Sequence, residues 1–216
     1  MEPRTLDHVA FWVSERDAIA DYCVRHLGMH VVDRQDDFTL VGSDARHGKL
    51  TLFDAQGPRE RGAFEHVALR VASLDGRAEQ HELPDGITVR VVEAPTEVDW
   101  DLDHVALRSR DPEATARAYL AYGFNPAEPK DGVPRVEVGG AYVEFHRGDP
   151  GGPERPLLNH IAVLVDSAEQ HRQDAEDAGI EVERFVDAAN TLAVFLFGPD
   201  RVRIEYVEHK PTFSLT

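Results

Sequence analysis

Short apolar runs with the same internal order of residues recur four times along the chain. Each run opens on an acidic or amide residue and continues with His, Val or Ile, and Ala; the four openings are Asp7, Glu65, Asp103 and Asn159. Because the runs are short, apolar and rich in β-branched residues, each predicts a β-strand. Four matching copies indicate internal duplication of one structural unit.

The segment after each strand predicts a helix and then further strands. Helix starts and stops are marked by Ser14 and Gly28 in the first repeat, by Asp111 and Gly123 in the third, and by Ser167 and Gly179 in the fourth. Short β-rich runs follow at 29–34, 38–41 and 49–53, at 135–138 and 141–146, and at 180–185, 191–197 and 202–207. This order predicts an α+β fold of tandem βαβββ modules, which form curved mixed sheets with the helices outside.

The second repeat is shorter than the others. It predicts a strand at 66–72, a weak helix at 74–82 and one strand at 87–93 before the third repeat begins. The missing length, roughly 20 residues, corresponds to about two strands with their turns. We therefore expect a truncated second module that has lost its last two strands.

The order of the modules divides the chain into two expected domains. Residues 1–101 would form an N-terminal module pair without a metal site, and residues 102–210 a C-terminal metal-binding pair. The segment 149–156 is rich in Pro and Gly and predicts a loop between the third and fourth repeats.

Composition and net charge exclude some classes of binding partner and indicate a cellular compartment. The 216 residues are 42% hydrophobic, enough for a packed core, and their formal charge of −17 argues against nucleic acid or an anionic membrane as a partner. No apolar run reaches about 18 residues, so no membrane span is expected. The first residues lack an apolar signal segment and Cys23 is the single cysteine, so we expect a cytoplasmic protein without an intramolecular disulfide.

Only the third and fourth repeats combine the recurring histidine with a carboxylate in the last strand. His104 is followed by Glu144, and His160 by Glu205, each Glu lying within an aromatic and aliphatic strand. Two modules that each direct one His and one Glu to a shared axis would form a His₂Glu₂ site. Such ligands suit one divalent ion, Ni, Zn, Co, Mn or Fe(II), with water in the open positions.

The first and second repeats lack this combination. The last strand of the first repeat, at 50–53, has no carboxylate, and the second repeat is expected to have lost the equivalent strand. We therefore expect His8 and His66 to be structural residues at strand starts, and replacement of His8 to leave metal binding unchanged.

These motifs resemble the vicinal oxygen chelate superfamily, which contains glyoxalases, bleomycin-resistance proteins and extradiol dioxygenases. The segments that carry the resemblance are 104–108, 142–144, 160–162, 198–200 and 203–206. The resemblance implies that paired modules curl into a cup, and that His104, Glu144, His160 and Glu205 bind the metal. It also implies that Arg108 lies in the cup near a carboxylate of the substrate.

The favoured function within this superfamily is that of a metal-dependent glyoxalase-type lyase, isomerase or epimerase. Its substrate would be a small molecule that chelates the ion through neighbouring oxygens. The ion would act as a Lewis acid, and Glu144 or Glu205 would transfer the proton without redox change. The sequence is compatible with a homodimer but does not determine the oligomeric state.

Two alternatives remain. An Fe(II) extradiol dioxygenase for catechol-type substrates would use His104, His160 and Glu205, and the silent N-terminal half matches its layout. Against it, the last module has no His between His171 and His209 and no Tyr before Tyr206 to move protons, and Glu144 would occupy a position that dioxygen and a catechol need. The third interpretation is a metal-free binding protein of the bleomycin-resistance type, which normally lacks the two-His, two-Glu set.

Overall fold

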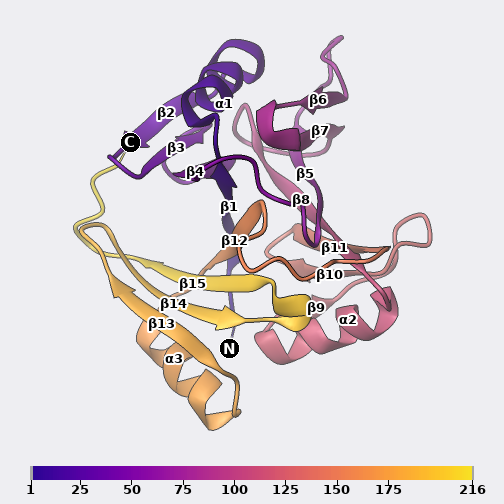
Figure 1. Ribbon diagram of the computed structural model, residues 1–216, viewed down its shortest axis with the longest axis vertical. Helices are drawn as coiled ribbons and strands as arrows, with labels where there is room; N and C mark the ends of the chain where they lie inside the picture. The colour runs from indigo at the N-terminus through magenta and orange to yellow at the C-terminus, as the bar shows by residue number, and fades with distance from the viewer. Residues whose placement is uncertain (1, 216) are drawn as a thin grey trace.

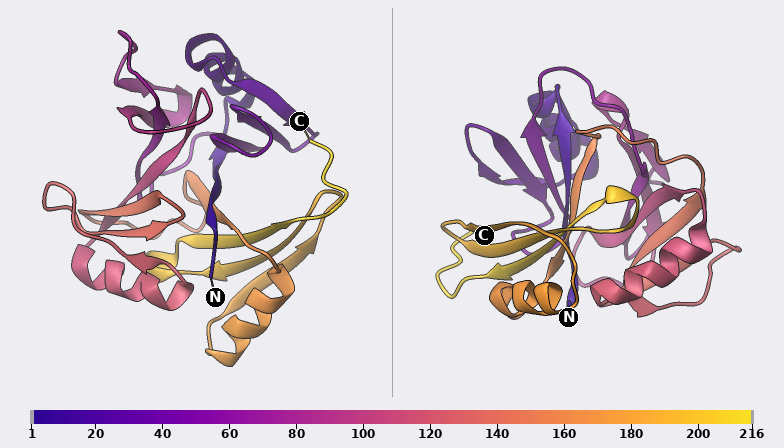
Figure 2. Two further views of the ribbon diagram at one scale, coloured as in Figure 1. Left: turned by 180° about the vertical axis from the view of Figure 1, so that it is seen from behind. Right: turned by 60° about the horizontal axis from the view of Figure 1, so that its bottom comes forward.

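The computed structural model describes residues 2–215, which form two curved mixed sheets with α-helices outside them (Figure 1). This confirms the expected α+β class. Helices α2 and α3 lie at one end of the molecule and α1 at the opposite end (Figures 1 and 2). No helix within residues 2–215 has the length and apolar character needed to cross a membrane.

Each module opens on a long strand that carries the recurring histidine. The first module comprises β1 (Thr5–Val13), α1 (Arg16–Tyr22), the π-helical turn η1 (Cys23–Leu27), β2 (His30–Arg34), β3 (Phe38–Gly42) and β4 (Lys49–Asp54). The second comprises β5 (Phe64–Val71), β6 (Gln80–Glu82), the short turn η2 (Pro84–Gly86) and β7 (Thr88–Glu93). The third comprises β8 (Asp101–Ser109), α2 (Pro112–Tyr119), η3 (Leu120–Tyr122), β9 (Asn125–Pro126), β10 (Arg135–Val138) and β11 (Ala141–Arg147). The fourth comprises β12 (Leu158–Leu164), α3 (Ala168–Asp177), β13 (Val182–Asp187), β14 (Thr191–Phe197), η4 (Pro199–Arg201) and β15 (Arg203–His209).

Two of the three helix starts expected from the sequence are confirmed as side-chain caps; the third, Ser14, does not cap α1, and its hydroxyl donates to Asp85 Oδ1 instead. The side chain of Asp111 accepts a hydrogen bond from the backbone N–H of Ala114 at the start of α2. Ser167 does the same for Gln170 at the start of α3. These oxygens satisfy backbone donors that the first helical turn leaves unpaired, which explains why the helices begin where they do.

The modules do not pair in the order of the chain. Sheet A has eight strands in the order β13-β14-β15-β12-β1-β4-β3-β2, and sheet B has seven in the order β6-β7-β5-β8-β11-β10-β9. Sheet A therefore joins the first module to the fourth through the antiparallel pair β1–β12, and sheet B joins the second to the third through β5–β8. The expected division between residues 101 and 102 does not coincide with this pairing, because it falls between two modules that share sheet B.

The second module is truncated, but it lacks different elements from those expected. Strand β7 pairs in parallel with β5, as the last strand of each other module pairs with its first, so the last strand is present. Strand β6 pairs antiparallel with β7, so the missing elements are the helix and the strand that follows it. The weak helix expected at 74–82 does not form: Asp75 and Gly76 have φ of 42° and 79°, in the left-handed region that ends a right-handed helix.

The two sheets share a hydrophobic core on the sides that face away from the histidines. Side chains alternate along a strand, so Val9 and Phe11 point away from His8, and both are fully buried in the main core cluster. The rings of Phe11 and Phe64, one from each sheet, meet edge-to-face with centroids 5.0 Å apart. The histidine-bearing faces of sheets A and B are therefore directed away from each other.

Candidate metal centre

The antiparallel pairing of β1 and β12 brings together histidines from the first and last modules. His8 lies opposite Ala162, and Ala10 opposite His160, so the two imidazoles are diagonal neighbours on one face with only methyl side chains beside them. Their Nε2 atoms are 3.0 Å apart. The small alanine in each motif thus makes room for the histidine of the partner strand.

Glu205 reaches the same point from β15. The parallel pairing of β12 with β15 sets Glu205 beside Ala162, and its Oε2 lies 2.8 Å from Nε2 of His160 and 3.1 Å from Nε2 of His8. Ligand atoms at adjacent positions of an octahedral ion with bonds of about 2.1 Å are about 3.0 Å apart. All three separations match that value, so the donor set fits three ligands on one face of a divalent ion.

Within residues 2–215, His8, His160 and Glu205 are the one group of three or more His, Cys, Asp and Glu side chains whose ligand atoms all lie within 4.8 Å of one another. The site is well enclosed, since the side chains of His160 and Glu205 are 3% and 9% exposed. Two histidines and one carboxylate with open positions are typical of non-haem Fe(II) oxygenases.

β-bulges orient the ring of each ligand histidine. The strand register shifts at Asp7 and again at Asn159, the residues that precede His8 and His160. A bulge re-aims the side chain of its extra residue, and here Nδ1 of His8 donates to Asp7 Oδ1 (2.8 Å) while Nδ1 of His160 donates to Asn159 Oδ1 (3.0 Å). Each Nε2 is therefore left to face a metal ion, the arrangement usual for metal-bound histidine.

Asp7 is itself held by two further groups. Lys49 Nζ donates to Asp7 Oδ1 at 2.8 Å, and Nε2 of His209 lies 3.0 Å from Asp7 Oδ2. Although burial opposes ionisation of this carboxyl group, Lys49, His209 and His8 hold its pKa well below the usual value. An ionised Asp7 fixes the orientation of His8 and increases its basicity as a ligand.

The three candidate ligands are strongly coupled electrostatically. Burial disfavours the imidazolium form of His8, but Asp7 and Glu205 outweigh it and raise the pKa of His8 to about 9. Burial likewise disfavours ionised Glu205, but His160 and His8 lower the pKa of that carboxyl far below its usual value. Burial also lowers the pKa of His160. A divalent ion bound at these three side chains would take the place of the proton on His8 as the positive charge beside Glu205.

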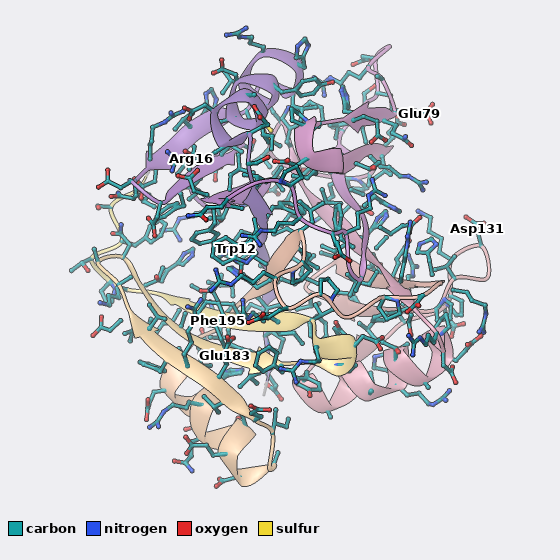
Figure 3. The ribbon with its side chains drawn as sticks, in the orientation of Figure 1. Trp12, Arg16, Glu79, Asp131, Glu183 and Phe195 are labelled. Atoms are coloured by element: carbon teal, nitrogen blue, oxygen red, sulfur yellow. The ribbon has the colours of Figure 1, made fainter. Side chains whose placement is uncertain are left out.

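Aromatic side chains surround this centre. Phe195 meets the ring of His160 edge-to-face at 5.2 Å, and Phe53 lies 6.1 Å from it. Trp12 packs on Phe53 at 5.5 Å, and its indole Nε1 is buried without a hydrogen-bond partner among the described residues. Figure 3 labels Trp12 and Phe195, which come from β1 and β14 on the two sides of the centre. The aromatic walls therefore suit a ligand with an aromatic ring.

Sheet B has two histidines and one carboxylate at positions equivalent to those in sheet A, but a neighbouring residue differs. Nε2 of His66 lies 3.0 Å from Nε2 of His104, which lies 3.6 Å from Glu144 Oε2. In sheet A the position beside Ala10 on the neighbouring parallel strand is Thr51; the equivalent position in sheet B, beside Ala68, is Arg90. A guanidinium beside two imidazoles opposes binding of a cation at this centre.

The structure does not bring the four sequence-predicted metal ligands together. His160 and Glu205 lie in sheet A with His8, whereas His104 and Glu144 lie in sheet B with His66, because the modules pair first with fourth and second with third. The remaining predicted site residue also lies in sheet B: the guanidinium of Arg108 pairs with Glu65 and is not beside the His8–His160–Glu205 centre.

Sequence reasoning missed His8, Asp7 and Asn159 as parts of a site. The available signal was the acidic or amide residue directly before each histidine, which recurs in all four repeats. In three of them this residue accepts from the Nδ1 of its histidine, including Asp103 to His104 at 2.6 Å. In the second repeat Glu65 binds Arg108 instead.

A comparison with protein families matches the N-terminal part of the chain. Residues 5–102 match the model of the Glyoxalase/Bleomycin resistance protein/Dioxygenase superfamily. Residues 5–102 belong to that superfamily. The resemblance drawn from the sequence is thereby confirmed, although the match covers the half of the chain that was expected to lack a metal site. No curated protein matches the sequence significantly.

Several solved structures share this fold over nearly the whole chain. A protein from Bacillus subtilis described as a "putative dioxygenase" superimposes with a TM-score of 0.80 at 15% identity, covering 98% of this chain and 87% of the other. Glyoxalase I from Zea mays gives a TM-score of 0.75 at 15% identity, covering 94% and 92%. The cppA protein from Streptococcus pneumoniae gives 0.60 at 13% identity, covering 95% and 98%.

Proposed function

We propose that this protein is a divalent-metal-dependent enzyme and that His8, His160 and Glu205 hold the ion. The ion that fits this donor set best is Fe(II), and the proposed reaction is ring-cleaving dioxygenation of a small dihydroxy-aromatic compound. The observation that supports the proposal is the three-ligand geometry itself: two imidazoles and one carboxylate, mutually about 3 Å apart on one face.

The residues around the centre have defined tasks under this proposal. His8, His160 and Glu205 would hold the ion, which when bound would supply Lewis-acid stabilisation of negative charge on the substrate and the redox chemistry for dioxygen. Asp7 and Asn159 fix the rings of His8 and His160. Phe53 and Phe195 exclude water and pack against the substrate ring. Both atoms of dioxygen enter the product as one ring C–C bond breaks, so the reaction needs no further reductant.

Redox-neutral proton transfer of the glyoxalase type is the second candidate. The argument for it from the sequence depended on Glu144 as a second carboxylate at the ion. In sheet A the first module pairs with the fourth, and the residue of the first module that corresponds to Glu144 is Thr51. Among residues 2–215, Glu205 is therefore the one carboxylate that meets both histidines. Glu205 would then have to serve both as ligand and as base, which makes this reaction the less favoured candidate.

The test begins with metal content. The purified protein is stripped with a chelator, reconstituted anaerobically with Fe(II), and given catechols and hydroquinones while oxygen uptake and ring-cleavage products are followed. We expect oxygen uptake in the wild type and in His104→Ala, and none in His8→Ala. The Ni, Zn and Mn forms are given α-keto hemithioacetals in parallel; turnover there without oxygen uptake would replace dioxygenation by proton transfer. A protein that binds no divalent ion at all would contradict both reactions and leave a metal-free binding protein.

A further inference from the structure

A cavity of about 500 Å³ is lined by Asn159, which precedes His160 of the candidate centre, and by Arg203, two positions before Glu205. It lies where β12 and β15 begin, between the loop that precedes β12 and the turn η4. Its polar lining is dominated by Arg110, Arg155, Arg201 and Arg203. In a chain whose formal charge is −17, these four guanidinium groups give one cavity a concentration of groups that can bind an anion.

At Asn159 the cavity reaches the Nδ1 side of His160, the side of the ring that faces away from the other two candidate ligands. This residue lines the cavity, and its Oδ1 accepts the hydrogen bond from Nδ1 of His160. On β15, Arg203 precedes Glu205 by two positions, so their side chains leave the strand on the same face about 7 Å apart. Phe197 likewise lies on the same face of β14 as Phe195, which packs against His160. A small ligand bound at the centre can therefore extend one substituent into the cavity.

Three of the four arginines that line the cavity already contact another side chain. Arg203 is held by Glu183 at 2.6 Å and Arg110 by Asp149 at 2.8 Å, so these two are partly neutralised. Arg201 stacks over the ring of Phe197 at 4.4 Å.

Two of the four arginines that line the cavity have no ion-pair partner in the part of the chain that the structure describes. Within residues 2–215 neither Arg155 nor Arg201 has an ion-pair partner, and both are exposed. Against the four arginines, the lining contains two carboxylates, Glu154 and Asp200. The cavity therefore offers two unneutralised, planar, bidentate donors beside a metal centre with aromatic walls.

We infer that the substrate is an aromatic carboxylic acid, whose carboxylate is bound in this cavity by Arg155 and Arg201 while its ring oxygens face the His8–His160–Glu205 centre. The inference rests on the proposed function for the position of the ring. Arg203 lines the path between the two ends of the substrate. The cavity thus selects acidic aromatic substrates over neutral ones of the same size, because a neutral group leaves the guanidinium pair without its partner.

The test measures binding separately from turnover. The protein is loaded with Zn, which undergoes no redox reaction, and titrated calorimetrically with 3,4-dihydroxybenzoate and with its methyl ester. We expect the acid to bind about tenfold or more tightly than the ester. In the double variant Arg155→Gln/Arg201→Gln the two ligands should bind within about twofold of each other, because the selective groups are gone. The matched control is Arg172→Gln on the outer face of α3, where Arg172 pairs with Glu169 and Glu176, away from the cavity.

The outcomes separate the cavity from the reaction. Equal binding of acid and ester to the wild type, or a preference that the double variant retains, would overturn the assignment of the cavity while leaving ring cleavage to its own assay. A preference for the acid that disappears in the double variant, in a protein that shows no oxygen uptake, would support the cavity and remove dioxygenation. Loss of the preference in Arg172→Gln as well would mean that overall charge, and not the cavity, selects the acid.

Discussion

Ala10 on β1 lies directly opposite His160 on β12, and His8 lies opposite Ala162 in the same way. This reciprocal register places the two Nε2 atoms 3.0 Å apart although the residues are 152 positions apart in the chain. Any one-residue slip between the strands would turn one histidine to the opposite face of the sheet. The metal centre therefore depends on the pairing of the first and last modules.

Replacing one histidine in each sheet should show which of the two centres binds the divalent ion. His8→Ala removes one of three proposed ligands and should weaken binding of the divalent ion by more than about 100-fold, since loss of an outer-shell partner alone costs 10–100-fold. His104→Ala changes the equivalent position in sheet B and should leave the metal content unchanged. The measurement is metal content by mass spectrometry after dialysis against a defined free-ion concentration, with circular dichroism to verify folding. Metal loss in His104→Ala with retention in His8→Ala would move the site to sheet B.

The carboxylate of Asp7, which accepts a hydrogen bond from Nδ1 of His8, should affect the affinity for the ion without contacting it. Asp7→Asn keeps the size of the side chain but removes the charge that orients His8, and should weaken metal binding by about 10–100-fold. Asp103→Asn, which makes the same change behind His104, is the matched control and should have little effect. Competition with a coloured chelator gives both affinities. Equal losses in the two variants would indicate general destabilisation of the sheets.

The contact between the two sheets should contribute strongly to stability. Phe11 is fully buried and its ring meets Phe64 of the other sheet. Phe11→Ala should lower the free energy of unfolding by about 3–5 kcal/mol, through lost burial and the cavity left behind. Phe185→Ala, at a ring that is 38% exposed, should cost about 1 kcal/mol or less. Urea unfolding followed by circular dichroism measures both, and similar costs would argue against a shared core.

Gly139 should be the most restrictive glycine of the hairpin between β10 and β11. It has a φ of 56°, and a Cβ atom there would lie 1.9 Å from the carbonyl oxygen of Arg4, just before β1. Gly132 also has a positive φ, of 79°, but a Cβ atom there would meet nothing within 4 Å. Gly132→Ala should cost only the backbone strain, about 1–2 kcal/mol, whereas Gly139→Ala should cost clearly more. Thermal unfolding of the two variants gives the comparison; equal shifts in melting temperature would show that the clash relaxes freely.

The single cysteine should make stability depend on pH in the alkaline range. Burial raises the pKa of the Cys23 thiol to about 12, whereas the pKa of a cysteine in an unfolded chain is about 8.5. Above that pH the unfolded chain loses a proton that the folded chain keeps, so the free energy of unfolding should fall by up to about 1.4 kcal/mol per pH unit until the folded thiol ionises. Urea midpoints between pH 8 and 10 measure this slope, and Cys23→Ala should reduce it. Identical slopes in the two proteins would mean that other groups dominate.

The sequence by itself determined the local units of this protein. The strand motifs, the helix caps at Asp111 and Ser167 and the βαβββ order follow from residues a few positions apart, because turns, caps and side-chain alternation are local properties. The shortness of the second module was also visible. Which elements it lacks was not, because β7 is recognised as a last strand only by its parallel pairing with β5.

Which histidines face each other was decided only by the tertiary structure. All four first strands carry the same motif, so β1 could pair with β5, β8 or β12 with equally good local register. The choice depends on side chains that meet across the core, such as Phe11 and Phe64, and on how the loops span the two sheets. Glu144 and Glu205 stood out in the sequence as carboxylates within apolar strands, but in the structure each contacts a histidine of its own sheet. His8 becomes a candidate ligand because strand pairing supplies the carboxylate that its own module lacks.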